Sequence, residues 1–194
     1  MTCARFRDLC VRHKSDKATD HRYDLIYPRY LEQYQEAEFV IYEIGVFRGA
    51  SMRVWSEYFP KAHIFGFDIN ERAASYDNGR GQVHITDVSA PGFADLVATL
   101  PKPDVVVDDG SHKEVDQLAA FDTLWPLLPD YGWYFIEDLS ARHTSRRRVE
   151  WGDYTATIGR QASELLHGTA THEIGEIHVH PEICVFRKML TYGL

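Results

Sequence analysis

The stretch Phe39-Val-Ile-Tyr-Glu-Ile-Gly-Val-Phe-Arg-Gly49 decides the fold. Its first part, up to Ile44, is β-branched and aromatic and too short for a helix, so it predicts a buried strand. The pattern then changes period, because from Ala50 to Phe59 large apolar residues recur every three or four positions until Pro60. A strand, a glycine turn and a helix are therefore expected in succession.

The same alternation repeats further along the chain. A broad apolar stripe of helical spacing runs from Val115 to Leu128, and it lies between two short apolar runs that are typical of buried strands. Strands separated by helical segments imply right-handed crossovers and a parallel sheet with helices on both faces. The further strands are expected at residues 63–67, 82–85, 104–107 and 133–136.

The end of the chain has a different pattern. Residues 172–180 and 183–186 both have the pattern of strands, and only Pro181 and Glu182 separate them. Two residues are enough for a hairpin but not for a crossover. We therefore expect an α/β fold whose mostly parallel sheet finishes in an antiparallel C-terminal hairpin.

The 194 residues fit a single domain, residues 1–194, which is long enough to bury a sizeable core. Within it, residues 1–38 have the spacing of a helical cover. The polar, basic segment 140–154 directly follows a predicted strand, where active-site lids are commonly placed, so we expect a lid there.

Charge and composition exclude several classes of protein. The formal net charge of −8 argues against a nucleic-acid partner, because phosphate binding requires clustered Lys and Arg. No stretch approaches the ~20 apolar residues of a membrane span. The three cysteines, Cys3, Cys10 and Cys184, show neither disulfide nor zinc spacing, which suits a reducing cytoplasm.

Gly45 and Gly49 could let the backbone approach a ligand closely and could point helix N-terminal amides at it. By itself, this spacing is common in ordinary tight turns. Asp68 strengthens the prediction, because it ends the next strand, where a carboxylate can accept both ribose hydroxyls of an adenosyl ligand. An NAD-dependent dehydrogenase is the alternative, although the middle glycine of the dinucleotide fingerprint is missing.

Four carboxylates occur at the ends of two strands that a parallel sheet would make neighbours, namely Asp108, Asp109, Glu137 and Asp138. Such a group is repulsive unless a cation or protons compensate it, and oxygen ligands favour Mg²⁺. The alternative is that these acids cap helices and face water. His112 follows Asp109 by three positions, and histidine is the usual general base near neutral pH.

Several of these segments resemble one known family. The segments are E-I-G-V-F-R-G-A-S (43–51), F-G-F-D-I (65–69), V-D-D-G-S-H (107–112) and I-E-D-L (136–139). They are similar to S-adenosylmethionine-dependent, metal-dependent sugar O-methyltransferases of the macrolide-sugar type. The K-S-D-K-A segment (14–18) resembles that family's G-T-D-K-G. The resemblance implies a Rossmann-like class I methyltransferase fold with a seven-stranded sheet.

The resemblance also implies roles for individual residues. Asp109, Glu137 and Asp138 would hold Mg²⁺, and His112 would be the catalytic base. Glu43 would lie near the methionine amino group or support the glycine turn. The residues implied to bind or support the methyl donor are Ser15, Lys17, Glu43, Gly45, Gly49, Asp68, Ile69, Asp87, Val88 and Asp108.

The function expected from the sequence is methyl transfer from S-adenosylmethionine to a hydroxyl of a sugar, glycoside or oligosaccharide. Mycobacterial methylmannose-polysaccharide 1-O-methyltransferases are enzymes of the kind implied. We expect a cytoplasmic homodimer. A catechol-type O-methyltransferase is the alternative within the class, and a non-catalytic module that binds an adenosyl ligand is the alternative outside it.

Overall fold

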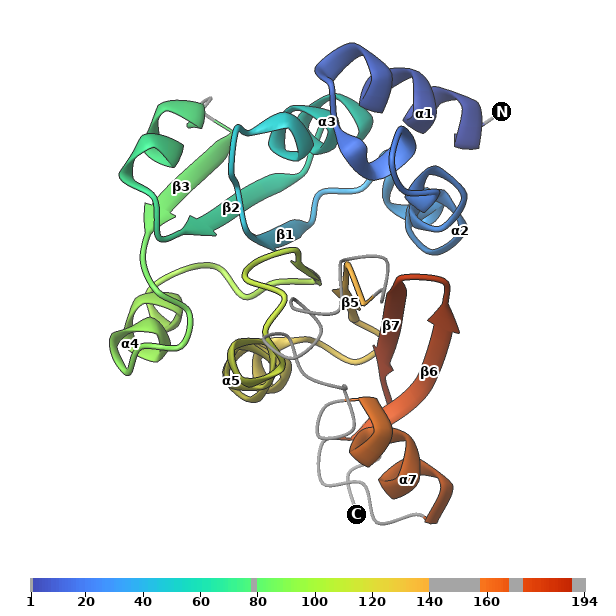
Figure 1. The fold of residues 1–194 in the computed structure, drawn as a ribbon, viewed down its shortest axis with the longest axis vertical. Coiled ribbons are helices and arrows are strands. Elements are labelled where there is room, and N and C mark those ends of the chain that lie inside the picture. Colours follow the sequence, from blue (N-terminus) through green and yellow to red (C-terminus); the bar gives the residue numbers. More distant parts are fainter. Residues whose placement is uncertain (1, 78–79, 140–157, 168–172, 190–194) are drawn as a thin grey trace. The chain divides into compact units, whose positions relative to one another are not determined.

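The computed structural model describes residues 2–77, 80–139, 158–167 and 173–189. In this part of the chain, the hydrogen-bonded order of the seven strands is β3-β2-β1-β4-β5-β7-β6. Figure 1 traces the helices and strands along the chain. By its internal contacts the chain divides into two compact units, Met1–Thr86 and Asp87–Leu194. We describe each unit by itself, and the expectation of one domain stays a prediction.

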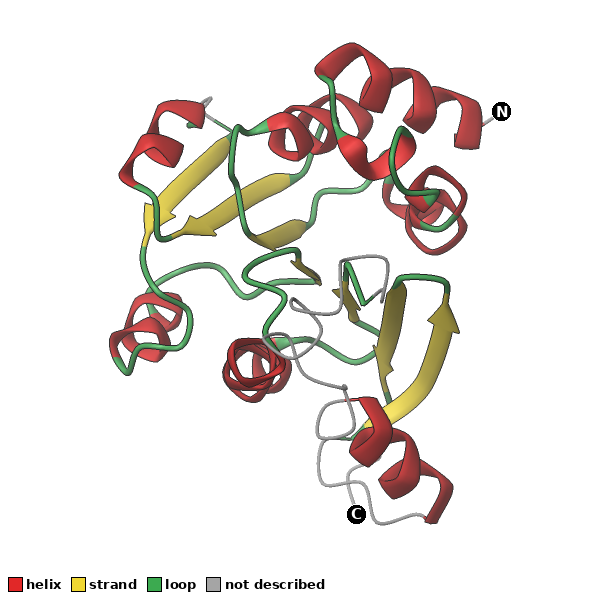
Figure 2. Cartoon of the chain, viewed as in Figure 1, coloured by secondary structure: helices red, strands yellow, loops and turns green. Residues whose placement is uncertain are grey.

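The first unit alternates helices and strands (Figure 2). Strands β1 and β2 are parallel, with Ile44 beside Phe67, and β3 is parallel to β2, with Ile85 beside Asp68. The predicted crossovers are therefore present. The elements are α1 (Thr2–His13), α2 (Tyr27–Leu31), β1 (Val40–Ile44), α3 (Ala50–Tyr58), β2 (His63–Asp68) and β3 (Gly81–Ile85), with short 3-10 helices at Asp16–Ala18, Tyr23–Leu25, Glu32–Tyr34 and Glu71–Tyr76.

Aromatic side chains hold the N-terminal helices of this unit against α3. The ring of Phe6 lies 5.4 Å from that of Trp55 and 5.0 Å from that of Tyr58, measured between centroids. Tyr27 meets Trp55 edge-on at 4.8 Å. Such pairs add to the burial of large apolar surfaces. The aromatic residues of the N-terminal segment therefore serve packing, as their helical spacing suggests.

The second unit contains a parallel and an antiparallel part. Strand β4 pairs with β5 in parallel, while β7 is antiparallel to both β5 and β6. Glu182, the second of the two residues between β6 and β7, has φ 70°, and a left-handed residue preceded by Pro181 is the arrangement of a type II turn. The elements are α4 (Gly92–Ala98), β4 (Val105–Asp108), α5 (Glu114–Leu124), the 3-10 helix Trp125–Leu127, β5 (Trp133–Ile136), α7 (Arg160–His167), β6 (Ile174–His180) and β7 (Ile183–Lys188).

The predicted fold class is confirmed: the sheet is mostly parallel, has seven strands and ends in an antiparallel pair. Helices α4 and α7 were not predicted. The lid predicted at residues 140–154 lies outside the described residues. Among the described residues, no helix has the length and apolar character that crossing a membrane requires.

Candidate functional site

The glycine turn after β1 has the backbone conformation that its glycines permit. Gly45 has φ 87° and Gly49 has φ 67°. A Cβ at Gly49 would come within 2.5 Å of Cγ of Tyr76, so a side chain there would be both strained and obstructed. Phe47, between the two glycines, also has a left-handed φ of 50° although it is not glycine. The turn is therefore held under strain.

Asp68 supplies the bonds that hold this turn. Its Oδ2 accepts hydrogen bonds from the backbone N–H groups of Val46, at 2.9 Å, and Phe47, at 2.7 Å. Its Oδ1 accepts one from the N–H of Asn70, at 2.8 Å. A carboxylate has about four lone-pair positions, so three are used within the chain. The contact with the ribose hydroxyls that the sequence predicted for Asp68 stays a prediction.

Three further residues predicted to contact or support the donor are buried in the first unit. The side chain of Glu43 accepts a hydrogen bond at Oε1 from the indole Nε1 of Trp55, at 2.9 Å. This bond links the end of β1 to α3, which fits the supporting role considered for Glu43. Ser15 and Lys17 are also buried. A buried lysine is costly unless it is compensated, which makes Lys17 unusual for a surface helix.

The other predicted donor residues differ in environment. Ile69 is 75% exposed, an unusual position for a large apolar side chain and a suitable one for a ligand contact. Asp87 and Val88 belong to the second unit, where Oδ1 of Asp87 accepts bonds from the N–H and hydroxyl of Ser89. These bonds lower the pKa of Asp87. The donor contacts of these three residues stay predictions.

A compact group of possible metal ligands lies at the ends of β4 and β5. Asp109, His112 and Asp138 each offer one ligand atom, and these atoms lie within 4.8 Å of one another. Nε2 of His112 is 3.9 Å from Oδ2 of Asp138. Parallel pairing of the two strands, with Asp108 beside Ile136, brings together residues that are far apart in sequence. The group is half-buried, so a substrate could reach an ion bound there.

Backbone strain marks the same group. His112 and Asp138 both have φ 59°, in the left-handed region that residues other than glycine seldom adopt. Such conformations persist where the surrounding structure imposes them, and they are concentrated at functional sites. No pattern in the sequence indicates this strain. The backbone, and not only the choice of rotamer, therefore aims both side chains.

Glu137 was predicted as a metal ligand and is not a member of this group. Its side chain is almost fully buried, and its backbone N–H donates to the carbonyl oxygen of Asp108 at 2.9 Å. His112, which was assigned to proton transfer, occupies the third place in the group. The geometry thus leaves two roles open for His112, and the ligand role of Glu137 stays a prediction.

Asp108 lies beneath the metal group and is buried. Its Oδ1 accepts a bond from the N–H of Gly110 at 3.3 Å. Burial, aided by the charge of the neighbouring Asp109, raises the pKa of Asp108 to about 7, although the N–H of Gly110 and the hydroxyl of Tyr134 lower it. Asp108 is thus bonded to the turn that carries Asp109, and its supporting role stays a prediction. Its assignment to the donor stays a prediction.

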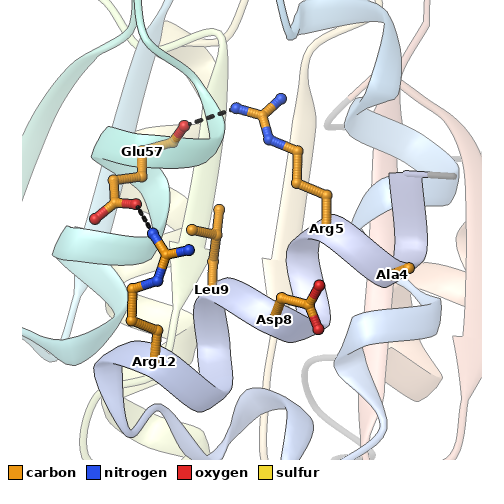
Figure 3. Close-up of a pocket in the computed structure, with 6 residues that line it drawn as sticks. All are labelled: Ala4, Arg5, Asp8, Leu9, Arg12 and Glu57. Carbon is orange, nitrogen blue, oxygen red and sulfur yellow. Dashed lines mark hydrogen bonds and ion pairs between the residues drawn. The ribbon is translucent and has the colours of Figure 1, made fainter.

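A hollow of about 410 Å³ lies between α1 and α3 (Figure 3). Arg5 and Arg12 reach from α1 to Glu57, where they bind its backbone carbonyl and its carboxylate respectively. Glu57 is eight residues beyond Gly49, or about 12 Å along the helix at 1.5 Å per residue. The hollow is therefore distant from the glycine turn. Its arginines are explained by favourable contact with the negative C-terminal end of α3.

The first unit has a strand, a glycine turn and a helix, with an acid at the end of its second strand, and the second unit has acids and a histidine at its strand ends. These features define a Rossmann-like protein with a candidate ligand site at the strand ends of each unit. Comparison with known sequences makes the class specific. The chain belongs to the methyltransferase domain family, whose model matches residues 42–139, about half of the chain. The resemblance noted in the sequence is thereby confirmed.

Two curated relatives are sugar O-methyltransferases. The 8-demethyl-8-alpha-L-rhamnosyl tetracenomycin-C 2'-O-methyltransferase of Streptomyces olivaceus is 28% identical over 95% of this chain and 55% of its own length. The mycinamicin VI 2''-O-methyltransferase of Micromonospora griseorubida is 32% identical over 70% of this chain and 33% of its own length. The chain thus spans about half of the first relative and a third of the second.

A solved structure agrees on the fold. The MycE methyltransferase from the mycinamycin biosynthetic pathway, in complex with Mg, SAH and mycinamycin VI, superposes with a TM-score of 0.82. It covers 97% of this chain and 56% of its own chain, at 24% sequence identity. At this identity the likeness establishes the class I methyltransferase fold.

Proposed function

We propose that this chain catalyses methyl transfer from S-adenosylmethionine to a sugar hydroxyl of a glycosylated small molecule, with the help of Mg²⁺. The observation that carries the proposal is the group of Asp109, His112 and Asp138, two of whose members are held in a left-handed backbone conformation. A protein that only binds an adenosyl ligand has no need for such a group. The names of the two relatives support a sugar acceptor.

The chemistry requires an oriented acceptor and a base. Methyl transfer to an alcohol is an in-line displacement at an activated methyl group, and a neutral sugar hydroxyl is a poor nucleophile. A bound divalent ion would stabilise the developing alkoxide. Asp109 and Asp138 would hold this ion, with Glu137 as the third predicted ligand. His112 would accept the hydroxyl proton at an imidazole nitrogen.

The donor is proposed to bind at the glycine turn of the first unit. Gly45 and Gly49 would let the backbone approach it closely, Asp68 would accept a ribose hydroxyl, and the exposed Ile69 would contact the apolar face of the adenine. Lys17 would lie near the methionine carboxylate. We further propose that the protein works in the cytoplasm as a homodimer, with no nucleic-acid partner.

An acceptor screen tests this function. The protein is incubated with methyl-labelled S-adenosylmethionine and either glycosylated polyketides that carry deoxysugars, free mono- and oligosaccharides, or catechols, with Mg²⁺ or with EDTA. We expect Mg²⁺-dependent labelling of a glycoside. Labelling of catechols alone would replace the proposal with the catechol-type alternative. Binding of the donor without labelling of any acceptor would favour a binding module.

A further inference from the structure

The second unit encloses polar atoms that have no hydrogen-bond partner among the described residues. They are Oδ2 of Asp108, both amide atoms of Gln117, and the hydroxyl of Tyr134. Gln117 is only 1% exposed, although glutamine is usually a surface residue. An unsatisfied buried polar group costs about 1–3 kcal/mol, so a natural sequence retains one for a reason.

Strand register and helix spacing place these three side chains near one another. Tyr134 pairs with Val106, two positions before Asp108, so the side chains of Tyr134, Val106 and Asp108 point to one face of the sheet. Helix α5 covers that face, because the rings of Phe121 and Tyr134 lie 4.9 Å apart. Gln117 is buried one turn before Phe121, toward the strand ends where α5 begins.

The distance along α5 from Phe121 to Gln117 is similar to the distance along the strand from the level of Tyr134 to that of Asp108. Moving four residues back along α5, from Phe121 to Gln117, covers about 6 Å. Moving two residues forward along a strand, from the level of Tyr134 to that of Asp108, covers about 6.6 Å. The amide of Gln117 therefore lies at the level of the Asp108 carboxylate.

We propose that Gln117 is a positioning residue for the metal site and that, in the metal-bound protein, its amide nitrogen and the hydroxyl of Tyr134 hydrogen-bond to Oδ2 of Asp108, which they do not do in this structure. The amide nitrogen of Gln117 and the hydroxyl of Tyr134 are donors, and the carboxylate oxygen is an acceptor. Oδ1 of Asp108 already accepts the N–H of Gly110. The carboxylate thus joins the turn that carries Asp109 to the buried face of α5. The proposal rests on the proposed role of Asp109 as a metal ligand.

A hydrogen bond that orients a metal-binding residue has a measurable effect on metal affinity. Loss of an outer hydrogen bond that orients a ligand typically weakens metal binding by 10–100-fold. Gln117→Met preserves the length and volume of the side chain and removes both polar amide atoms. We expect it to raise the Kd for Mg²⁺ about tenfold, as measured by titration calorimetry without donor or acceptor. The melting temperature of the metal-free protein should stay the same or rise, because in that state the substitution removes an unsatisfied buried amide.

Gln161→Met is the matched control. Gln161 is equally buried in the second unit, and both of its amide atoms also have no partner among the described residues. It borders a small void lined by apolar side chains, with no carboxylate among them. The same substitution there should leave the Kd for Mg²⁺ unchanged.

Tyr134→Phe tests the same group of residues, Asp108, Gln117 and Tyr134, with a smaller change. It replaces Gln117→Met in the experiment if that variant does not fold. It should raise the Kd for Mg²⁺ severalfold. Equal affinity, within twofold, of wild type and both cluster variants would overturn the inference while the proposed function stands. A wild-type protein that does not bind Mg²⁺ at all would overturn the inference together with the metal-assisted mechanism.

Discussion

Asp68→Ala should impair donor binding by more than the loss of a ribose contact, because the same carboxylate holds the glycine turn. Three backbone N–H groups, at 2.7–2.9 Å, lose their acceptor. Hydrogen bonds to a charged group are worth about 1.5–3 kcal/mol, and the exposure of this loop reduces each to about 1 kcal/mol. Two of these groups, those of Val46 and Phe47, belong to the glycine turn, which is thus destabilised by about 2 kcal/mol. Phe47, at φ 50°, is then free to leave its strained conformation.

Donor binding must then order the turn again, which alone raises the Kd about 30-fold. With the lost ribose contact, we expect a rise of about 300–4,500-fold in the Kd for S-adenosylhomocysteine, measured by calorimetry. A ribose contact alone predicts about 10–150-fold. Hydrogen exchange separates the two effects, because the amides of Val46 and Phe47 should lose protection in the donor-free variant.

The exposed Glu71 offers a control, since Glu71→Ala removes an equal charge close to Asp68 in sequence without removing a bond to the turn. Asp68→Asn keeps one acceptor oxygen and should fall between the wild type and Asp68→Ala. Unchanged amide protection in the donor-free Asp68→Ala protein would refute the conclusion that Asp68 holds the glycine turn by hydrogen bonds. A Kd within twofold of wild type would refute its place in the donor site as well.

EDTA should abolish turnover and Mg²⁺ restore it, and Asp109→Ala should imitate the chelated state with little change in donor Kd; full activity with verified absence of metal would exclude this mechanism. His112→Ala should lower kcat by about 10²–10⁴-fold with unchanged Mg²⁺ affinity if it is the base, whereas a large rise in the Kd for Mg²⁺ would make it a ligand instead. The pKa of Glu176 is lowered chiefly by its hydrogen bond with His178 and also by Arg187, so its contribution to stability is present above its ordinary pKa of 4.5 and is lost as the pH falls through the lowered value. Glu176→Gln should therefore reduce the free energy of unfolding at pH 7 by at most about 1 kcal/mol, because the pair is partly exposed, and denaturant titrations in acid should show no difference from wild type.

The strands could be predicted because their signals are local. The apolar runs ending at Ile44 and Ile136 stop where the observed strands stop, and the two residues between β6 and β7 allow only a hairpin. Helix α4 was missed because Gly92–Ala98 is short and buries only Phe93 and Val97, which gives a weak periodic signal.

The site was predictable in residue type and only partly in geometry. Acids at neighbouring strand ends indicated a metal group, and the structure brings Asp109 and Asp138 together. The hydrogen bonds from the glycine turn to Asp68 could not be predicted from the sequence, because their donors are backbone amides, which every residue type except proline offers. The burial of Gln117 was hidden as well, since a polar residue on a helix gives no sign of which side it faces.

The left-handed backbone at Asp138 makes the order of the two acids that end β5 matter. Glu137 has ordinary backbone geometry and a buried side chain, whereas Asp138 has φ 59° and points to the metal group. Aspartate tolerates left-handed geometry better than most residues, because its short side chain can bond locally. Exchanging the two, as Glu137→Asp with Asp138→Glu, would keep composition and charge the same. The exchanged protein would nevertheless be strained at position 138 and underpacked at position 137. In this segment the order of the two acidic residues therefore matters for the structure, although their composition and charge would be unchanged.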